Sequence, residues 1–154
     1  MSKSLRRVAA ALEAAGLKAE ITEPGPTRTA EDAAAACRCA IDQIVKSLVF
    51  IGESGRLYLF LTAGGKRLDP ARAAALACEA LHRADADTVR RETGFAIGGV
   101  APLGHLRAPA IFADPRLLDF DIVHAAAGTP RHVFGAAPDA LVAACSARVA
   151  PFSS

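Results

Sequence analysis

The chain has 154 residues, of which 52% are hydrophobic and 5% aromatic, and its formal net charge is +2 at pH 7. This length is typical of one domain, so we expect a single domain over residues 1–154. The small net charge argues against a non-specific nucleic-acid binder, and no stretch approaches the roughly twenty apolar residues of a membrane span.

The N-terminal stretch predicts a helix, a short strand and a loop. Ser4 is a candidate N-cap for a helix that ends near Ala15, just before Gly16. Residues 18–22 predict a short strand, and residues 23–27, with two prolines and a glycine, predict a loop. Because charged residues interrupt the apolar start of the chain, we do not expect a signal peptide and expect a cytoplasmic protein.

The next segment predicts a helix and two paired strands. Thr29 and Asp32 fit a capping box that starts a helix ending near Cys37. The following run, Asp42–Ile51, is almost continuously apolar, which is typical of a strand buried on both faces. A hairpin turn then returns the chain as a second strand over residues 56–62.

The C-terminal half predicts three further helices and three short strands, delimited by capping residues, prolines and glycines. The first of these helices follows Asp69 and Pro70 and covers residues 71–81. The second begins at residue 85 or 87 and ends at residue 92, and the third covers residues 138–145. The strands cover residues 110–112, 120–125 and 131–134. Because neighbouring strands form hairpins, this order favours an α/β protein of the α+β type. We expect a mixed, mainly antiparallel sheet surrounded by helices.

Lys46 lies inside the apolar strand over residues 42–51. Its ammonium group can reach water along the aliphatic stem, pair with a buried carboxylate, or face a cleft that requires a charge. The first of these is the commonest for a lysine in a strand. The neighbouring Ser47 should face the other side, and we expect no serine or cysteine nucleophile.

Gly94, Gly98, Gly99 and Pro102 form a second unusual stretch. Glycines permit positive φ angles and close backbone approach, so a loop rich in them can offer N–H groups to an oxygen or an anion. The spacing matches neither a dinucleotide-binding nor a phosphate-binding glycine loop. A plain turn with tight corners explains these residues as well as a functional loop does.

The four cysteines and four histidines lack the spacing of a metal site. Cys37 and Cys39 are two residues apart in a helical pattern, so their side chains point to different sides. We therefore expect free thiols, no metal and no cofactor.

The lysine strand and the glycine-proline loop together resemble the YbaK/EbsC family. The resemblance is carried by residues 43–50, Thr93–Gly94 and residues 98–102, and it extends over most of the chain. This family includes free-standing aminoacyl-tRNA deacylases related to the editing insertion of bacterial prolyl-tRNA synthetase. The resemblance implies a mixed sheet, partly closed like a barrel, with helices around it.

The resemblance also implies a reaction, the hydrolysis of the ester that links a small wrong amino acid (Ala, Cys, Ser, Thr or 2-aminobutyrate) to a tRNA, here tRNA for proline. By similarity, Lys46 is the essential lysine, which holds the terminal adenosine or a phosphate, or polarises the ester. Gly98 and Gly99 would supply N–H donors to the developing oxyanion, and Pro102 would fix the loop. Water or a group of the substrate is the expected nucleophile.

An editing pocket of this kind selects its amino acid by size, because one methylene group changes binding by only about 1–3 kcal/mol. The candidate residues for the walls of this pocket are Thr29, Ala30, Ile44 and Phe50, although a role as helix cap or in the core also explains each of them. The resemblance implies further substrate contacts at Gly94, Thr129 and His132.

Other polar residues have structural explanations. Asp114 precedes Pro115 and predicts an N-cap, His124 lies on an alternating strand, and His105 predicts an exposed loop. The basic residues near the N-terminus and near the glycine loop are either solvated or contact the phosphates of a tRNA acceptor stem.

The expected partners are the acceptor end of a mischarged tRNA and, as a second candidate, an aminoacyl-tRNA synthetase. The near-neutral charge and the lack of a helix-turn-helix pattern argue against sequence-specific DNA binding, and no membrane partner is expected. A function of a different class stays open: a non-catalytic module that binds a nucleotide or an RNA end in the same cleft.

Overall fold

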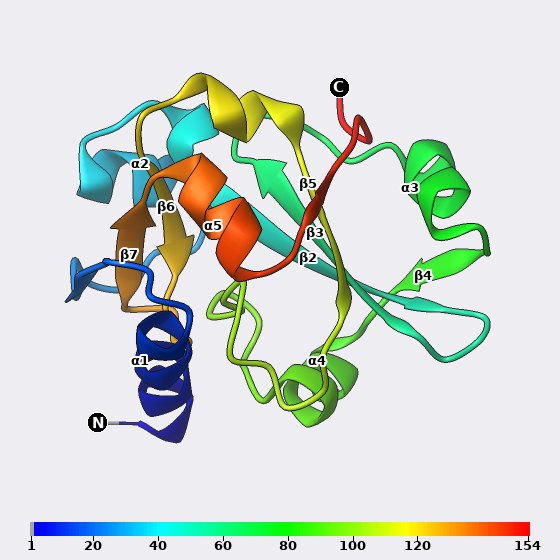
Figure 1. Cartoon of the computed structure of the whole chain (residues 1–154), viewed down its shortest axis with the longest axis horizontal. Helices are drawn as coiled ribbons and strands as arrows, with labels where there is room; N and C mark the ends of the chain where they lie inside the picture. The colour runs from blue at the N-terminus through cyan, green and yellow to red at the C-terminus, as the bar shows by residue number, and fades with distance from the viewer. Residues whose placement is uncertain (1) are drawn as a thin grey trace.

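Short helices and strands alternate along the chain (Figure 1), and the computed structural model describes residues 2–154. None of the helices in this range is long and apolar enough to cross a membrane. The elements in chain order are α1 (Lys3–Ala14), β1 (Ile21–Thr22), α2 (Ala30–Cys37), η1 (Ile41–Gln43), β2 (Val45–Gly52), β3 (Leu57–Ala63), α3 (Pro70–Ala77), β4 (Leu81–Arg83), α4 (Ala86–Thr93), β5 (Ala110–Ala113), η2 (Pro115–Asp119), β6 (Val123–Ala126), β7 (Val133–Ala136), α5 (Pro138–Ala144) and β8 (Arg148–Val149).

The strands form two sheets, which confirms the expected mixed, mainly antiparallel α+β fold. One sheet has the order β4-β2-β3-β5-β8, in which β2 is antiparallel to both of its neighbours and β5 is parallel to β3 and β8. The other is the antiparallel sheet β1-β7-β6. Figure 1 shows β2, β3 and β5 crossing the centre of the molecule, with β6 and β7 to their left. Neither sheet closes into a barrel, so the partly barrel-like shape implied by the resemblance is corrected to two open sheets.

β3 is buried along its whole length and separates two clusters of the core. Leu57 and Leu61 face a cluster that includes the buried side of α1. Tyr58 and Phe60 face an aromatic cluster, in which the ring centroids of Phe60 and Phe152 are 5.0 Å apart. Because successive side chains of a strand point to opposite faces, β3 must be covered on both sides, and this fixes its position in the middle of the sheet.

Capping residues set the helix boundaries largely as expected. The side chains of Thr29, Asp69 and Asp85 each accept a hydrogen bond from a backbone N–H in the first turn of α2, α3 and α4. Gly94 ends α4 with a φ of 80°. The first helix differs, because Ser2, and not Ser4, accepts the hydrogen bond from the N–H of Leu5.

The strands expected over residues 18–22, 120–125 and 131–134 are present but begin later, as β1, β6 and β7. Two other boundary predictions are wrong for local reasons. The helix expected to reach Leu81 ends at Ala77, because Cys78 adopts a left-handed conformation with a φ of 59° and the chain continues into β4. β4 then pairs with the C-terminal end of β2. The strand expected from Asp42 begins at Val45, since residues 41–43 form the short helix η1.

Candidate active site

A cavity of about 320 Å³ lies beside the N-terminal half of β2. β4 pairs only with Phe50–Gly52, so the edge of β2 at residues 45–48 has no ladder partner opposite β3 within residues 2–154. A single bridge between Ile44 and His124 joins this edge to β6. Beyond that bridge, the facing edges of the two sheets line the cavity.

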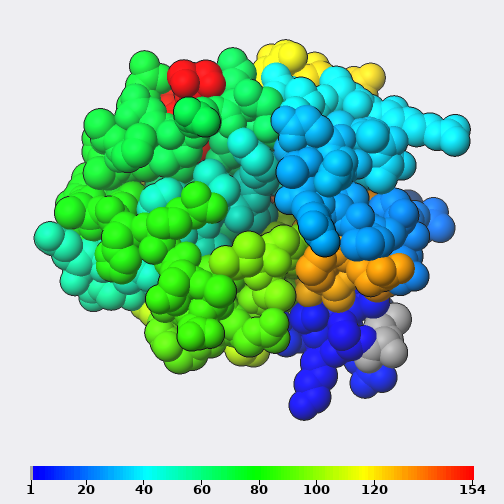
Figure 2. Space-filling model, turned by 180° about the vertical axis from the view of Figure 1, so that it is seen from behind, coloured from blue at the N-terminus to red at the C-terminus, as the bar shows by residue number. Residues whose placement is uncertain are grey.

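Four segments that are distant in the sequence close the cavity. They lie within residues 27–33 at the start of α2, 44–48 in β2, 97–100 in the glycine loop, and 124–133 from β6 to β7. In Figure 2 these segments, coloured blue, cyan, yellow-green and orange, meet around the hollow near the centre of the face. The fold thus brings the lysine strand and the glycine loop to one site.

Lys46 lines this cavity and is half-buried. Its Nζ donates a hydrogen bond to the carbonyl oxygen of Lys66 at 2.6 Å. Burial lowers the pKa of Lys46 below its usual value; the negative charges of Glu31 and Asp42 oppose this shift, and the positive charges of Arg67 and Arg83 add to it. The lysine is therefore neither free in solvent nor paired with a carboxylate among the described residues.

Ser47 points to the opposite face of β2, as alternation requires, yet it also lines the cavity, because the cavity wraps around the strand edge. Its Oγ is buried and has no hydrogen-bond partner within residues 2–154.

The sequence did not point to two further cations that line the cavity, Arg28 and Arg83. The guanidinium of Arg83 lies 5.7 Å from the ring centroid of Phe50, across the β2–β4 pair. No Asp or Glu of residues 2–154 lines the cavity, so with Lys46 its charged groups are all positive. Such a lining favours an anionic ligand. The sequence signal was weak, since Arg83 lies in a strand with no apolar alternation.

The glycine loop forms a tight turn at the cavity. The N–H of Gly99 donates to the carbonyl of Ala96 at 2.9 Å, and Gly98 has a φ of 90°, which a type II turn requires at its third position. Gly98 lines the cavity, and its N–H makes no hydrogen bond within residues 2–154. The donor role expected for Gly99 is therefore corrected, because its N–H is already engaged and Gly99 lies outside the lining.

Gly99 has a different function in the fold, which is to let the loop touch the turn before β7. A Cβ at Gly99 would lie 2.8 Å from the Cα and carbonyl carbon of Thr129. The two loops that carry Gly98 and Thr129 are thus in backbone contact, and any larger residue at position 99 would separate them.

Thr129 and His132 form a hydrogen-bonded chain at the cavity wall. The Oγ1 of Thr129 is 2.6 Å from Nδ1 of His132, and Nε2 of His132 is 3.0 Å from Oε2 of Glu23. When Nε2 carries the proton and donates to Glu23, Nδ1 accepts from the Thr129 hydroxyl. The arrangement orients the Thr129 oxygen toward the ring and makes it a stronger acceptor on its free side.

The remaining predicted residues divide between the lining and the core. Thr29 and Ala30 line the cavity at the start of α2, and Ile44 lines it while being almost fully buried. Phe50 belongs to the aromatic cluster and does not reach the cavity. Pro102 is buried and also lies outside the lining.

Gly94 lies outside the lining and contacts α1 instead. Its carbonyl oxygen accepts a hydrogen bond from Nη2 of Arg7 at 2.8 Å, and Nε of Arg7 donates to the carbonyl of Gly104 at 3.1 Å. The guanidinium also lies 4.9 Å from the ring centroid of Phe95. Arg7 therefore holds both ends of the loop over residues 94–104. This corrects the expectation that the basic residues near the N-terminus, Arg7 among them, are solvated or bind phosphates.

Burial favours the neutral form of two histidines, His105 and His124. Burial lowers the pKa of His105 to about 4, and its ring packs edge-on against Phe95 with centroids 5.5 Å apart, so the expectation of an exposed loop residue is wrong. Burial also lowers the pKa of His124, which lines the cavity. No group of three or more His, Cys, Asp or Glu side chains in residues 2–154 could hold a metal ion.

Comparison with known proteins identifies the family of the chain. Residues 24–144 match the family described as aminoacyl-tRNA editing domain. A crystal structure described as a candidate trans-editing enzyme for prolyl-tRNA synthetase is 46% identical, with a TM-score of 0.92 over 100% of this chain and 99% of that one. The structure of a hypothetical protein is 30% identical, with a TM-score of 0.90 over 96% and 99% of the two chains.

A curated relative, the uncharacterized protein YwhH of Bacillus subtilis (strain 168), is 31% identical over 101 residues. The aligned stretch covers 66% of this chain and 64% of that protein, which is less than two thirds of the relative's length.

Proposed function

The chain belongs to the aminoacyl-tRNA editing domain family, and on that premise we propose that it is a cytoplasmic, trans-editing aminoacyl-tRNA deacylase. Its substrate would be the acceptor end of a tRNA, with tRNA for proline the first candidate, that carries a small wrong amino acid. The likeness to a candidate trans-editing enzyme for prolyl-tRNA synthetase supports this choice of tRNA. In the reaction water adds to the ester carbonyl, the bond from the acyl carbon to the ribose oxygen breaks, and the free amino acid and the tRNA hydroxyl are released.

One observation carries the proposal. Lys46 lines the same cavity as Gly98, whose N–H makes no hydrogen bond within residues 2–154, and this cavity is large enough for a small amino acid and the sugar that bears it. Negative charge develops on the carbonyl oxygen in the transition state, and a preoriented N–H such as that of Gly98 stabilises it without reorganisation.

Positively charged side chains at the cavity would attract the phosphates of a tRNA end. Arg28 and Arg83 are exposed at the cavity, where they would contact the phosphates next to the terminal adenosine. Lys46 lies deeper and would bind a phosphate or polarise the ester region. Thr129, oriented by His132, would bind the amino acid or the attacking water.

A panel of tRNAs charged with Ala, Cys, Ser, Thr or 2-aminobutyrate tests the proposal, with release of the amino acid as the readout. The wild type should release at least one of them, and Lys46→Ala should lower kcat/KM by about a hundredfold. Lys18→Ala is the matched control, because Lys18 is exposed and lies outside the cavity lining.

Two results would count against the proposal. Full activity of Lys46→Ala would remove the role of the lysine. Binding of tRNA without release from any member of the panel would favour the alternative function, a module that binds a nucleotide or an RNA end in the same cavity without chemistry.

A further inference from the structure

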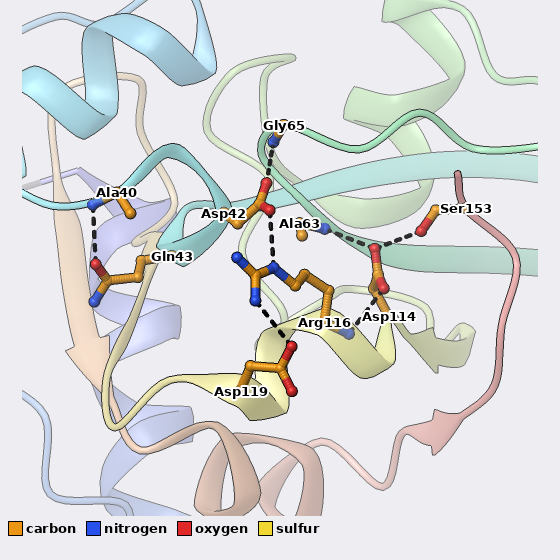
Figure 3. A network of polar contacts seen from close by, with 9 residues as sticks. All are labelled: Ala40, Asp42, Gln43, Ala63, Gly65, Asp114, Arg116, Asp119 and Ser153. Atoms are coloured by element: carbon orange, nitrogen blue, oxygen red, sulfur yellow. Dashed lines mark hydrogen bonds and ion pairs between the residues drawn. The ribbon is translucent and has the colours of Figure 1, made fainter.

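The turn that follows β3 is held from outside the cavity by a carboxylate (Figure 3). The N–H of Gly65 donates to Oδ1 of Asp42 at 2.8 Å, and Oδ2 of Asp42 accepts from Nε of Arg116 at 2.9 Å. Burial raises the pKa of Asp42, but the hydrogen bonds from Arg116 and Gly65 lower it further than burial raises it, and the net pKa is below the usual value. Asp42 is therefore an ionised acceptor at neutral pH.

Close packing gives this turn little freedom. A Cβ at Gly64 would collide with the carbonyl oxygen of Ile41, and a Cβ at Gly65 would collide with Oδ1 of Asp42. The turn thus lies directly against η1: only glycine fits at position 64, and a larger residue at position 65 would displace the Asp42 carboxylate. On its other side, Asp114 accepts hydrogen bonds from the N–H of Ala63 at 3.1 Å and from Oγ of Ser153 at 2.7 Å, so the start of the turn is fixed as well.

The next residue of the turn, Lys66, connects this support to the cavity. Its N–H donates to the carbonyl of Ala63 at 2.9 Å, and its own carbonyl accepts the hydrogen bond from Nζ of Lys46. An ammonium group has three N–H donors, and this is the one that Lys46 uses within residues 2–154. The direction of the Lys66 carbonyl therefore decides where the two remaining donors of Lys46 point.

We propose that Asp42 is a positioning residue for Lys46: by accepting from Gly65 it fixes the direction of the Lys66 carbonyl, and through that carbonyl it fixes the position of the ammonium group of Lys46, a residue of the cavity lining. The positioning of Lys46 rests on the geometry alone, whereas its importance for activity rests on the proposed function. Asp42 does not line the cavity, so it acts on Lys46 through the turn and through its negative charge, which favours the protonated lysine.

Chemical modification tests the positioning without any assay of activity. The four lysines of the chain are Lys3, Lys18, Lys46 and Lys66, and the rate at which acetic anhydride acylates each can be followed by peptide mass spectrometry. In Asp42→Ala the acylation of Lys46, relative to Lys18, should rise about threefold or more, because the ammonium loses a well-placed carbonyl acceptor and a nearby negative charge, both of which favour its protonated form.

Asp119→Ala is the matched control. Asp119 accepts from Nη1 of Arg116 at 2.9 Å, but it is exposed and does not touch the turn. Its loss disturbs the same arginine and should leave the acylation of Lys46 unchanged. Asp42→Asn removes the charge but keeps an oxygen that can accept from Gly65, so it measures the effect of the charge alone, and its effect should be smaller than that of Asp42→Ala. It also serves as the test variant if Asp42→Ala does not fold.

A double-mutant cycle then separates positioning from general destabilisation. Asp42→Ala should lower kcat/KM by about tenfold, and the same change in a Lys46→Ala background should cause no further loss, because both changes remove one function. Unchanged acylation of Lys46 in Asp42→Ala and Asp42→Asn, or fully additive losses of kcat/KM, would overturn the proposal. A wild type without deacylase activity whose Lys46 still responds to Asp42 would refute the proposed function and leave the positioning intact.

Discussion

Replacing Gly99 by alanine tests whether the contact between the glycine loop and the Thr129 turn matters for activity. The new Cβ would lie 2.8 Å from the Cα and carbonyl carbon of Thr129, whereas ordinary contacts begin at 3.4 Å. The backbone of Thr129 must therefore retreat by about 0.6 Å, since neither atom belongs to a flexible side chain. A displacement of 1 Å near reacting groups costs about a hundredfold in rate, so we expect kcat/KM to fall by about tenfold.

Overpacking of this kind also lowers the free energy of unfolding by about 1–3 kcal/mol, so the activity must be compared at matched stability. Gly16→Ala supplies the control. Gly16 has a φ of 67°, and a Cβ there would meet nothing within 4 Å, so the substitution introduces backbone strain of about 1–2 kcal/mol far from the cavity. Urea unfolding measures both losses, and deacylation of charged tRNA measures the rates. Wild-type kcat/KM in Gly99→Ala, or an equal loss in Gly16→Ala, would refute the reasoning.

Two further predictions concern His105 and Arg83. The folded-state pKa of His105, about 4, lies below its unfolded value of about 6.5, so the unfolded chain binds the proton first and stability is lost as the pH falls between these values. Between pH 7 and pH 5 this residue should contribute a loss of about 2 kcal/mol, and urea unfolding should show a smaller loss in His105→Leu than in the wild type. Arg83→Gln should raise KM for the charged tRNA and make its salt dependence less steep, because one phosphate contact is lost, while kcat stays near the wild-type value. Equal salt slopes for the two proteins would contradict the phosphate contact.

The fold was predictable where local chemistry fixes an element. Thr29, Asp69 and Asp85 cap their helices with their own side chains, so the positions of α2, α3 and α4 follow from residues that are adjacent in the sequence. β4 was not predictable, because Leu81–Arg83 has no periodic pattern and becomes a strand only by pairing with β2. Arg83 at the cavity was missed for the same reason.

The candidate site was predictable in its centre and not in its surroundings. Lys46 and Gly98 stood out by residue type, and the structure places both in one lining. Gly99 has the same residue type as Gly98, but only the three-dimensional turn shows that its N–H is already donated to Ala96. The role proposed for Asp42 depends on a backbone turn more than twenty residues away, and no sequence pattern reports such a contact.

The hydrogen bonds of Arg7 to Gly94 and Gly104 have a practical consequence. Similarity to the editing family begins at residue 24, so a fragment trimmed to that boundary would lack the first helix altogether. In such a fragment the loop over residues 94–104 would lose the hydrogen bonds that Arg7 makes at its two ends. The smallest fragment that keeps both ends of this loop anchored must therefore include a helix that lies outside the match to the family model.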